Sequence, residues 1–329
     1  MKNILIVNPG STAIKYTLFD EKGTEISREK FEVSKKSAEK KFLKNLPPIE
    51  KIGIRIVHGS GLVGPQKLDR KVKKSIADAE IFAPIHNRIA LETLEKLKKQ
   101  FPKTQVFAVF DSDFHQHFLP ELKTLPLPEK LAKKFKLRRY GFHGIAIESA
   151  WNAIEKPRGK IIFCHLGGGS SITAVRNGKS IWNSMGLTPL SGAMGKTRTG
   201  SIDPDIFHVL SKKMSVEKIS NLLSNKSGFL GLAKSTDTKK IMKKASDGKS
   251  REKFVVEIFV QSVLKEIFTA FGILQGTDLL VFSGGIGENN KFLRGEILKK
   301  TKILGLTKSK TQIAKIDEAK IIWEKIRKL

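Results

Sequence analysis

Three glycine-rich turns, each directly after an apolar stretch, are the segments of this 329-residue chain best suited to chemistry. They read NPGST at residues 8–12, GGGSS at 167–171 and GGIGEN at 284–289. Glycine lets backbone N–H groups approach an anion closely, and a helix that begins after the turn adds a favourable dipole. None of the turns has the spacing of a P-loop or of a Rossmann dinucleotide motif. The pattern therefore predicts phosphate groups held between two strand units.

Two charged side chains beside apolar runs are candidates for the same chemistry. Arg55 interrupts the apolar run IGIRIVHG at 52–59, where an unpaired guanidinium would be costly, so we expect it to line a cleft. Asp111 follows the apolar run at 105–110, and open α/β sheets place functional groups at the carboxyl ends of their strands. Capping a helix is the alternative role for Asp111.

The elements that must position these residues include a pattern that occurs twice. Residues 3–27 and 160–182 both read as strand, glycine turn, strand, polar turn and strand. In the second copy, Asn177 and Gly178 predict a type I′ hairpin, because both central residues of that turn need positive φ. Two copies so far apart in the chain predict duplicated domains that face each other across a cleft.

The rest of the chain predicts alternating strands and helices. Strands are expected at 52–59, 105–110 and 279–282, the last of these being the final strand. Helices are expected at 34–46, 71–79, 88–99, 128–139, 148–154, 216–224, 241–245, 252–271 and 317–328, with a loop at 82–87. We place an N-terminal domain at 1–155, a nucleotide-binding domain at 156–314, and a C-terminal helix at 315–329 that packs back on the first domain.

Composition limits the class of protein and its partners. The chain has 61 Lys and Arg against 32 Asp and Glu, a net charge of +29, which raises nucleic acid or an anionic membrane as partners. The lysines, however, alternate with apolar residues as on the solvated faces of amphipathic helices, so we expect no specific nucleic acid and no membrane partner. One cysteine, Cys164, is expected to be buried. Without a signal-peptide pattern or an apolar run near ~20 residues, the sequence predicts a cytoplasmic protein.

Seven motifs, in order along the chain, resemble those of the acetate kinase family, which is related to sugar kinases, actin and heat-shock chaperone ATPases. They are NPGSTAIK at 8–15, RIVHG at 55–59, APIHN at 83–87, VFDS at 109–112, RRYGFHG at 138–144, the loop at 185–204 that contains TRTGSIDP, and GGIGEN at 284–289. The resemblance implies an α/β fold of two duplicated actin-like (ribonuclease H-like) domains, with mixed sheets flanked by helices and the active site in the cleft between them.

The activity that the resemblance implies is reversible transfer of a phosphoryl group from ATP to acetate, giving ADP and acetyl phosphate, with Mg²⁺ or Mn²⁺ and in a homodimer. A carboxylate nucleophile is already ionised, so cations rather than a general base must supply the catalysis. Arg55 and Arg198 can hold carboxylate and phosphoryl oxygens, and His143 can donate to the phosphoryl group. Asp111 resembles the catalytic aspartate of the family, and we expect it to orient Arg55 or the metal shell rather than to accept a proton.

Further site residues follow from the resemblance alone. It assigns nucleotide binding to His165, Leu166, Gly167, Gly168, Gly169, Asp237, Thr238, Lys239, Gly284, Gly285, Ile286, Gly287, Glu288 and Asn289. It assigns the phosphate loop to Asn8, Ser11 and Lys15, the metal to Asn8 and Glu318, and an apolar pocket for the acyl methyl group to Val57, Ile85, Phe142 and Pro189. A carboxylate in the first turn of a helix is the alternative role for Glu318.

Departures from the family pattern leave other functions open. They occur at Ala13, Arg88, Gly168, Gly195, Lys196, Ser201 and Lys239, and the chain is shorter than typical members. One methylene in an apolar pocket is worth only ~1–3 kcal/mol of discrimination, so a propionate or butyrate kinase of the same family is one alternative. A catalytically weakened paralogue that binds nucleotide or a polyanion is the other.

Overall fold

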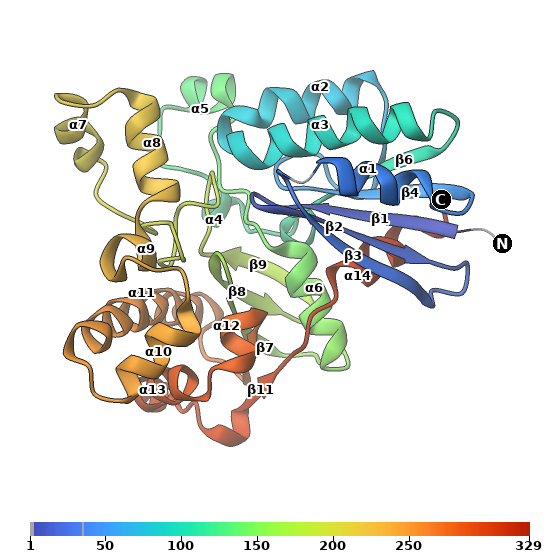
Figure 1. Cartoon of the computed structure of the whole chain (residues 1–329). Helices are drawn as coiled ribbons and strands as arrows, with labels where there is room; N and C mark the ends of the chain where they lie inside the picture. Colours follow the sequence, from blue (N-terminus) through green and yellow to red (C-terminus); the bar gives the residue numbers. More distant parts are fainter. Residues whose placement is uncertain (1–2, 35) are drawn as a thin grey trace. The chain divides into compact units, whose positions relative to one another are not determined.

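Figure 1 shows a computed structural model that describes residues 3–34 and 36–329. By their internal contacts the described residues form two compact units. Unit 1 contains the residues up to Gln116 together with His143–Ser149 and Asp317–Leu329, and unit 2 contains His117–Phe142 and Ala150–Ile316. Each unit has one β-sheet. The predicted domain bounds, 1–155 and 156–314 with the helix at 315–329 packed on the first domain, stay a prediction.

The sheet of unit 1 is mixed and has the strand order β3-β2-β1-β4-β6-β5. Its strands are β1 (Asn3–Pro9), β2 (Ala13–Phe19), β3 (Glu25–Glu32), β4 (Ile49–Ile56), β5 (Gln66–Lys67) and β6 (Gln105–Phe110). Strands β1, β2 and β3 form an antiparallel meander, whereas β4 runs parallel to β1 and β6 runs parallel to β4. The predicted strand, glycine turn and strand at the start of the chain are confirmed.

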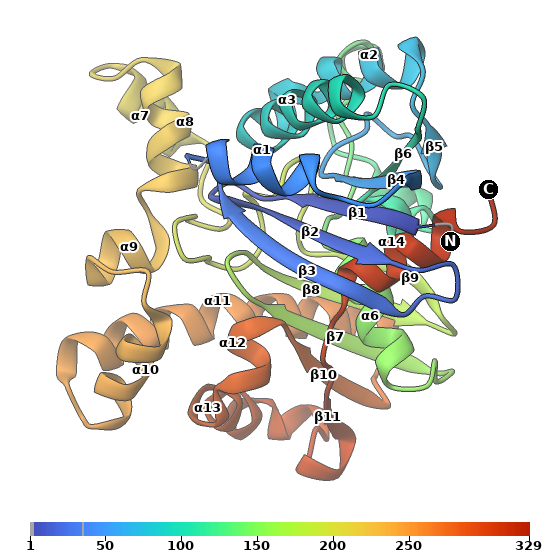
Figure 2. The same ribbon diagram turned by 45° about the vertical axis from the view of Figure 1, so that its right-hand side comes forward.

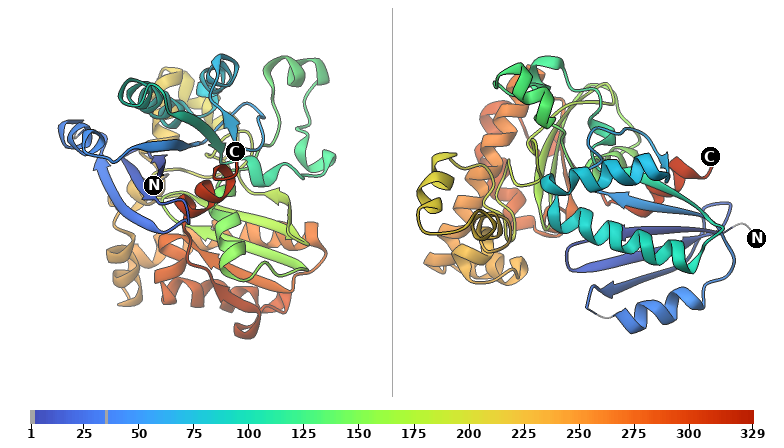
Figure 3. Two further views of the ribbon diagram at one scale, coloured as in Figure 1. Left: turned by 90° about the vertical axis from the view of Figure 1, so that its right-hand side faces the viewer. Right: turned by 90° about the horizontal axis from the view of Figure 1, so that it is seen from above.

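Helices cover both faces of this sheet because its central strand is apolar on both sides. Leu5 and Val7 of β1 pack with α1 (Lys36–Lys44), α2 (Arg70–Asp78) and α3 (Pro84–Gln100). Ile4 and Ile6 point the other way and pack with α14 (Glu318–Ile326). Figure 2 shows α2 and α3 on one side of β1 and β4 and α14 on the other, and the view from above in Figure 3 shows α2 and α3 lying across the blue strands.

Two helix boundaries in this part of the chain correct the predictions. Helix α3 begins at Pro84, so the predicted loop at 82–87 is wrong for most of its length. Proline suits the first turn of a helix, where its missing N–H leaves no bond unmade. Helix α6 (Gly144–Ala153) begins four residues before the predicted start at 148, directly after His143.

The sheet of unit 2 repeats the pattern, in the order β11-β10-β7-β8-β9. Its strands are β7 (Lys160–Leu166), β8 (Ser170–Arg176), β9 (Lys179–Asn183), β10 (Leu279–Ser283) and β11 (Thr311–Ile313). Again the first three form an antiparallel meander, and β10 runs parallel to β7. The hairpin prediction is confirmed, since Asn177 and Gly178 have φ of 51° and 80°. Strand β11 shows that 279–282 is not the final strand.

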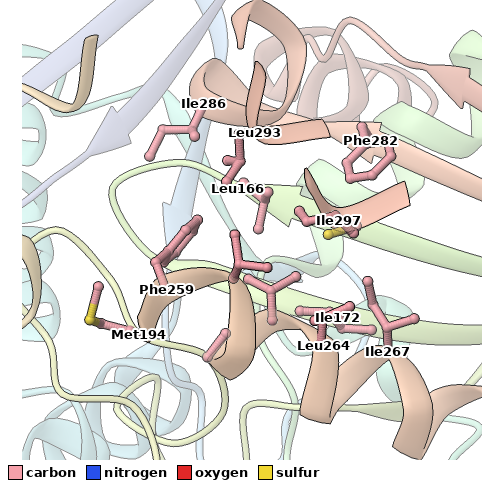
Figure 4. Packing of buried hydrophobic residues seen from close by; sticks show 14 of the residues in the cluster. Leu166, Ile172, Met194, Phe259, Leu264, Ile267, Phe282, Ile286, Leu293 and Ile297 are labelled. Atoms are coloured by element: carbon pink, nitrogen blue, oxygen red, sulfur yellow. The ribbon is translucent and has the colours of Figure 1, made fainter. Parts of the chain in front are cut away.

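The core of unit 2 forms around the long helix α11 (Ser250–Leu274). In Figure 4, Phe259, Leu264 and Ile267 of α11 lie among side chains of the sheet and of the helices that follow β10. The other helices are α4 (Pro120–Lys123), α5 (Glu129–Phe135), α7 (Asp205–Ser211), α8 (Val216–Asn225), α9 (Gly228–Ala233), α10 (Thr238–Ser246), α12 (Gly284–Asn289) and α13 (Lys291–Thr301). In the described parts of the chain no helix has the length and apolarity needed to cross a membrane.

Two further predictions are corrected in unit 2. The third glycine turn at 284–289 is the short helix α12, which follows directly on β10. The helix predicted at 128–139 ends at Phe135, because Lys136 has φ of 54° and turns the chain into the left-handed conformation that ends helices.

Gly53 in β4 provides a test of how closely α14 packs on the sheet. A Cβ at Gly53 would lie 2.7 Å from Ile322 Cγ2 and 2.8 Å from Ile326 Cδ1, both on α14. We expect Gly53→Ala to lower the free energy of unfolding by about 1–3 kcal/mol, because a filled contact must open. Urea unfolding followed by tryptophan fluorescence measures the change.

Gly272→Ala is the matched control. Gly272 lies exposed on α11, and no other described atom would come within 4 Å of its added Cβ beyond the helix's own backbone. Alanine should raise helix stability there by about 0.5–1 kcal/mol. Equal stability of Gly53→Ala and the wild-type protein would contradict the close packing of α14.

Candidate active site

Arg55 and Asp111 form a two-point ion pair at the carboxyl ends of two parallel strands. Arg55 is the penultimate residue of β4, and Asp111 directly follows β6, its parallel neighbour. The guanidinium donates from Nε to Asp111 Oδ1 at 2.8 Å and from Nη2 to Oδ2 at 2.6 Å. The side chains are only 15% and 1% exposed. The contact that we expected between Asp111 and Arg55 is therefore present.

Two more residues complete the surroundings of the Arg55 guanidinium. Its Nη1 donates to Asn8 Oδ1 at 3.0 Å and lies 3.6 Å from Glu318 Oε1. Asn8 Nδ2 in turn donates to Glu318 Oε2 at 2.7 Å. Asn8 lies near the end of β1, and Glu318 is the first residue of α14. Side chains from three other segments, β1, the residue after β6 and the start of α14, thus converge on one guanidinium.

Burial and charge act in opposite directions on this group of residues. Burial works against the charge on Arg55, but Asp111 and Glu318 outweigh it and raise the pKa of Arg55 above its usual value. Burial also raises the pKa of Asp111, and Arg55 works against that rise. A buried charge that loses its partner is strongly destabilising. The four residues therefore depend on one another.

His143 is held next to Asp111 by its backbone. The backbone of His143 donates a hydrogen bond to the Asp111 carboxyl group, and Gly144 N–H donates to Asp111 O at 2.7 Å. A Cβ at Gly144 would lie 2.3 Å from that carbonyl oxygen, so the close approach requires glycine. His143 itself has φ of 61°, a strained conformation for a residue with a side chain. Such strain is concentrated at functional sites.

The predicted phosphate loop lies on the same sheet. Asn8 and Lys15 are directly opposite each other on β1 and β2, so their side chains share one face. Lys15 and Ser11 are exposed, whereas Asn8 is buried. The structure therefore places an exposed amino group on the face that holds the Asn8 amide.

The other two glycine segments meet in unit 2. β7 ends at Leu166, and α12 begins at Gly284 after the parallel strand β10. A Cβ at Gly284 would lie 2.6 Å from Leu166 O, and Gly284 has φ of 77°, so only glycine fits there. His165 Nδ1 lies 3.2 Å from Ser283 Oγ. Glu288 Oε1 accepts a hydrogen bond from Gly284 N–H at 3.0 Å, so that amide is used within α12.

The turn at 167–169 is open where a ligand could approach. A Cβ on Gly168 would meet no other atom within 4 Å in the described chain. The Ser170 hydroxyl, in contrast, is 1% exposed and has no hydrogen-bond partner among residues 3–34 and 36–329. Lys196 N–H donates to Gly168 O at 3.0 Å, which ties the loop at 185–204 to this turn.

The remaining predicted residues are divided between the two units. Arg198 is half-buried in unit 2, where its Nη1 donates to Pro189 O at 3.4 Å. The four predicted pocket residues comprise Val57 and Ile85 in unit 1 and Phe142 and Pro189 in unit 2. The apolar pocket therefore stays a prediction. At the start of α10, Asp237 caps the helix by accepting from Lys240 N–H, Thr238 is buried and Lys239 is exposed.

Sequence reasoning missed two groups of charged residues. Lys325 on α14 contacts Asp113 and Glu148, whose positions in the chain lie far from it. In unit 2, Arg139 donates to the carbonyl groups of residues 183–185, and Glu266 on α11 acts on its charge. The motif RRYGFHG marked Arg139, and Asp113 lies at the end of the same predicted strand as Asp111, but no local spacing marks Glu148 or Glu266.

The carboxylate of Glu318, with Asn8 beside it, is suited to bind a magnesium ion that arrives with a nucleotide. Among the described residues, no three His, Cys, Asp or Glu side chains gather into a ligand cluster. Mg²⁺ is commonly held by one or two carboxylates and completes its shell with waters and phosphate oxygens. Glu318 fits that pattern because its side chain is 17% exposed, although Oε2 also accepts from Asn8. Asp111 is only 1% exposed and is held at both oxygens by Arg55. A metal role for Glu318 and Asn8 stays a prediction.

Comparison with a solved structure shows the fold. A ROK family protein from Streptococcus pneumoniae is similar in fold, with a TM-score of 0.52, at 12% identity over 99% of this chain and 98% of that chain. The two mixed sheets flanked by helices are those of the actin-like ATPase fold, which acetate kinases and ROK sugar kinases share. The predicted fold class is confirmed.

The sequence comparisons then give the family. The family model described as the Acetokinase family matches residues 31–325, and an acetate kinase of Acetivibrio thermocellus is 33% identical over 92% of this chain and 88% of its own length. The chain belongs to the acetokinase family.

Two similar proteins of known structure are named for different acids. A propionate kinase from Francisella tularensis has a TM-score of 0.91 and 30% identity, with 100% of both chains covered. The acetate kinase of Entamoeba histolytica has a TM-score of 0.86 and 27% identity, with 100% of this chain and 99% of that chain covered.

Glu266 provides a prediction about pH and stability. Burial raises the pKa of Glu266 from 4.5 to about 7, against the opposing charge of Arg139. A raised pKa in the folded state gives stability that is present below about pH 4.5 and lost as the pH rises to about 7. We expect Glu266→Gln to become more stable than the wild-type protein by up to about 3 kcal/mol as the pH passes through that range.

Urea unfolding at pH 5 and pH 8 measures the difference. Glu217→Gln on the exposed part of α8 is the control, because the pKa of Glu217 is lowered by its backbone hydrogen bond and should show no such gain. The same stability difference between Glu266→Gln and the wild-type protein at both values would refute the raised pKa.

Proposed function

We propose that this protein is a short-chain carboxylate kinase that forms an acyl phosphate from ATP and acetate. One observation carries the proposal: a guanidinium held at two points by Asp111 lies at the ends of the central strands in a chain of the acetokinase family. A carboxylate oxygen attacks the γ-phosphorus, the bond between that phosphorus and the bridging oxygen breaks, and the electron pair leaves with ADP. The step needs no proton transfer.

Arg55 would supply the positive charge that brings two anions together. Phosphoryl transfer depends almost entirely on positioning and charge stabilisation. Both oxygens of Asp111 accept from Arg55, so Asp111 is suited to hold the guanidinium and not to take a proton. Since Asn8 and Glu318 contact the same guanidinium, its orientation is limited from three sides.

His143 and Arg198 have supporting roles in the proposal. The His143 side chain would donate to an oxygen of the transferring phosphoryl group, because its backbone is tied to Asp111. Arg198 would stabilise the charge on the phosphoryl group during transfer, as the family resemblance implies. Glu318 and Asn8 would hold Mg²⁺, which supplies charge neutralisation on the phosphates when bound.

The glycine segments of unit 2 would bind the nucleotide. Gly168 leaves open space at the turn after β7, and the buried Ser170 hydroxyl next to it has no protein partner in the described chain. The N–H of Gly284 already donates to Glu288. We therefore assign the contact with the nucleotide phosphates to the turn at 167–169 and not to the start of α12. Asp237, Thr238 and Lys239 would lie near the base of the nucleotide.

Propionate is the second candidate substrate. The similar structure with a TM-score of 0.91 is a propionate kinase, whereas the acetate kinase of Acetivibrio thermocellus is a relative by sequence. Val57, Ile85, Phe142 and Pro189 would set the preference, with a discrimination of only ~1–3 kcal/mol per methylene. We expect activity with both acids.

A homodimer belongs to the same proposal. Ile206, Phe207 and Val209 of α7 are 40%, 37% and 62% exposed, and an apolar surface of this kind favours association between protein chains. Light scattering in solution tests it, and a monomer at micromolar concentration would count against it.

Trapping the acyl phosphate with hydroxylamine tests the reaction. Purified protein with Mg-ATP should give hydroxamate with acetate and propionate, and less with butyrate. Arg198→Ala should lower kcat by ~10³-fold, because an arginine that stabilises the transferring group contributes about that much.

The control is Arg251→Ala, since Arg251 is exposed and donates only to Leu232 O among the contacts shown for it. It should keep the wild-type rate. A folded wild-type protein that gives no hydroxamate with any of the three acids would refute the kinase function, and an active Arg198→Ala would refute the role of that arginine.

A further inference from the structure

Lys325 lies between two carboxylates in a largely buried part of unit 1. Its Nζ donates to Asp113 Oδ2 at 3.0 Å and forms an ion pair with Glu148 Oε2 at 2.9 Å. The three side chains are 18%, 6% and 23% exposed, respectively. None of them belongs to the motifs that gave the predicted site.

Each of these three residues lies on a segment that also carries a residue of the candidate active site. Asp113 follows Asp111 by two positions, in a short 3₁₀ helix at Asp113–His115. Glu148 lies in α6, which begins directly after His143. Lys325 lies in α14, whose first residue is Glu318. One ammonium group therefore joins the segments of three site residues.

The position of Lys325 on α14 suits it to hold the helix in place. Lys325 and Glu318 are seven residues apart, or about two helical turns, so both side chains lie on the same face, ~10 Å apart along the axis. The start of the helix is bound to α6 separately, because Asp317 N–H donates to Ser149 Oγ at 2.7 Å. Helix α14 is thus fixed to α6 at both ends.

The charges make this arrangement sensitive to the loss of the lysine. Two carboxylates that are largely removed from water need a cation between them, and removing one partner of a buried ion pair leaves uncompensated charge. Asp113 is also bound by Gly64 N–H through its Oδ1, so it has little freedom to turn away. Without Lys325, the carboxylates would repel each other and push α6 and the 3₁₀ helix apart.

We propose that Lys325 is a positioning residue for phosphoryl transfer, which sets the geometry of Glu318, Arg55 and Asp111 by locking α14 to the segments after β6 and His143. The inference rests on the proposed kinase function for its kinetic consequence. Lys325 touches none of the reacting groups and acts through the helix that it holds. A displacement of about 1 Å at the reacting atoms can cost ~10²-fold in rate.

Lys325→Met tests the proposal, because it keeps the length of the side chain and removes the charge. We expect kcat for hydroxamate formation to fall ~10- to 100-fold. The affinity for ADP in the absence of Mg²⁺ should not change, because Glu318 is proposed to act through the metal and the predicted nucleotide residues lie in unit 2. Lys325→Arg, which keeps the charge, should recover most of the lost kcat. Lys328→Met is the matched control, since Lys328 is exposed near the same end of the chain.

Hydrogen exchange of the native protein measures how firmly Lys325 holds α14, and this measurement does not depend on enzyme activity. Amides of α14 and of the segment 143–149 should exchange faster in Lys325→Met than in the wild-type protein and in Lys328→Met. If the wild-type protein makes no acyl phosphate, the kinase function fails, and the exchange measurement still decides whether Lys325 holds the helix.

Two results would overturn the inference. One is a kcat of Lys325→Met equal to that of Lys328→Met, and the other is unchanged exchange in α14. Should Lys325→Met fail to fold, Glu148→Gln replaces it, because this variant keeps the pair with Asp113 and removes one of the two ties. It should show a smaller fall in kcat and faster exchange in α6, and wild-type values in both would equally refute the proposal.

Discussion

The pair between Arg55 and Asp111 is the interaction on which the candidate site depends. A guanidinium that is mostly removed from water is tolerated only where its charge is compensated and its N–H groups are bonded. Asp111 supplies two acceptors, Asn8 a third, and Glu318 further negative charge. The pair can form because β4 and β6 are parallel neighbours whose carboxyl ends meet at one edge of the sheet. The topology of unit 1 thus determines the site.

Other features of unit 1 follow from keeping this pair in place. Position 144 must be glycine because the Asp111 carbonyl oxygen lies too close for a Cβ. The preceding residue, His143, has a strained backbone with positive φ. Helix α14 can bring Glu318 to Arg55 only because Gly53 leaves room for Ile322 and Ile326 against the sheet. The packing of uncharged residues around the charged ones therefore decides where the charged ones lie.

Local patterns predicted much of this fold and the central part of the site. The repeated strand and glycine turn and the hairpin at Asn177 follow from short-range rules that the structure bears out. The contact between Asp111 and Arg55 was instead expected from the family resemblance, as one of two roles for Asp111, and it is present. The helix at 284–289 was read as a turn, because glycine-rich runs rarely favour helix and only the contact of Gly284 with β7 shows why glycine is needed.

Long-range partners could not be predicted in this way. Lys325 and Asp113 are 212 residues apart, and nothing in either neighbourhood marks the other. The same holds for Glu266, whose burial beside Arg139 depends on how α11 packs. The lysines of the last helix were expected to face water, and tertiary structure placed Lys325 in partly buried ion pairs with Asp113 and Glu148.

The pH dependence of kcat in Asp111→Asn tests most directly whether Asp111 orients Arg55 or acts as a base. Asparagine keeps the shape of the side chain but turns one acceptor into a donor that faces the guanidinium. The account predicts that kcat falls ~10²-fold and that the pH profile keeps the shape of the wild-type profile, because only the position of Arg55 changes. An acid limb that is present in the wild-type protein and absent in the variant, or an unchanged kcat, would contradict it.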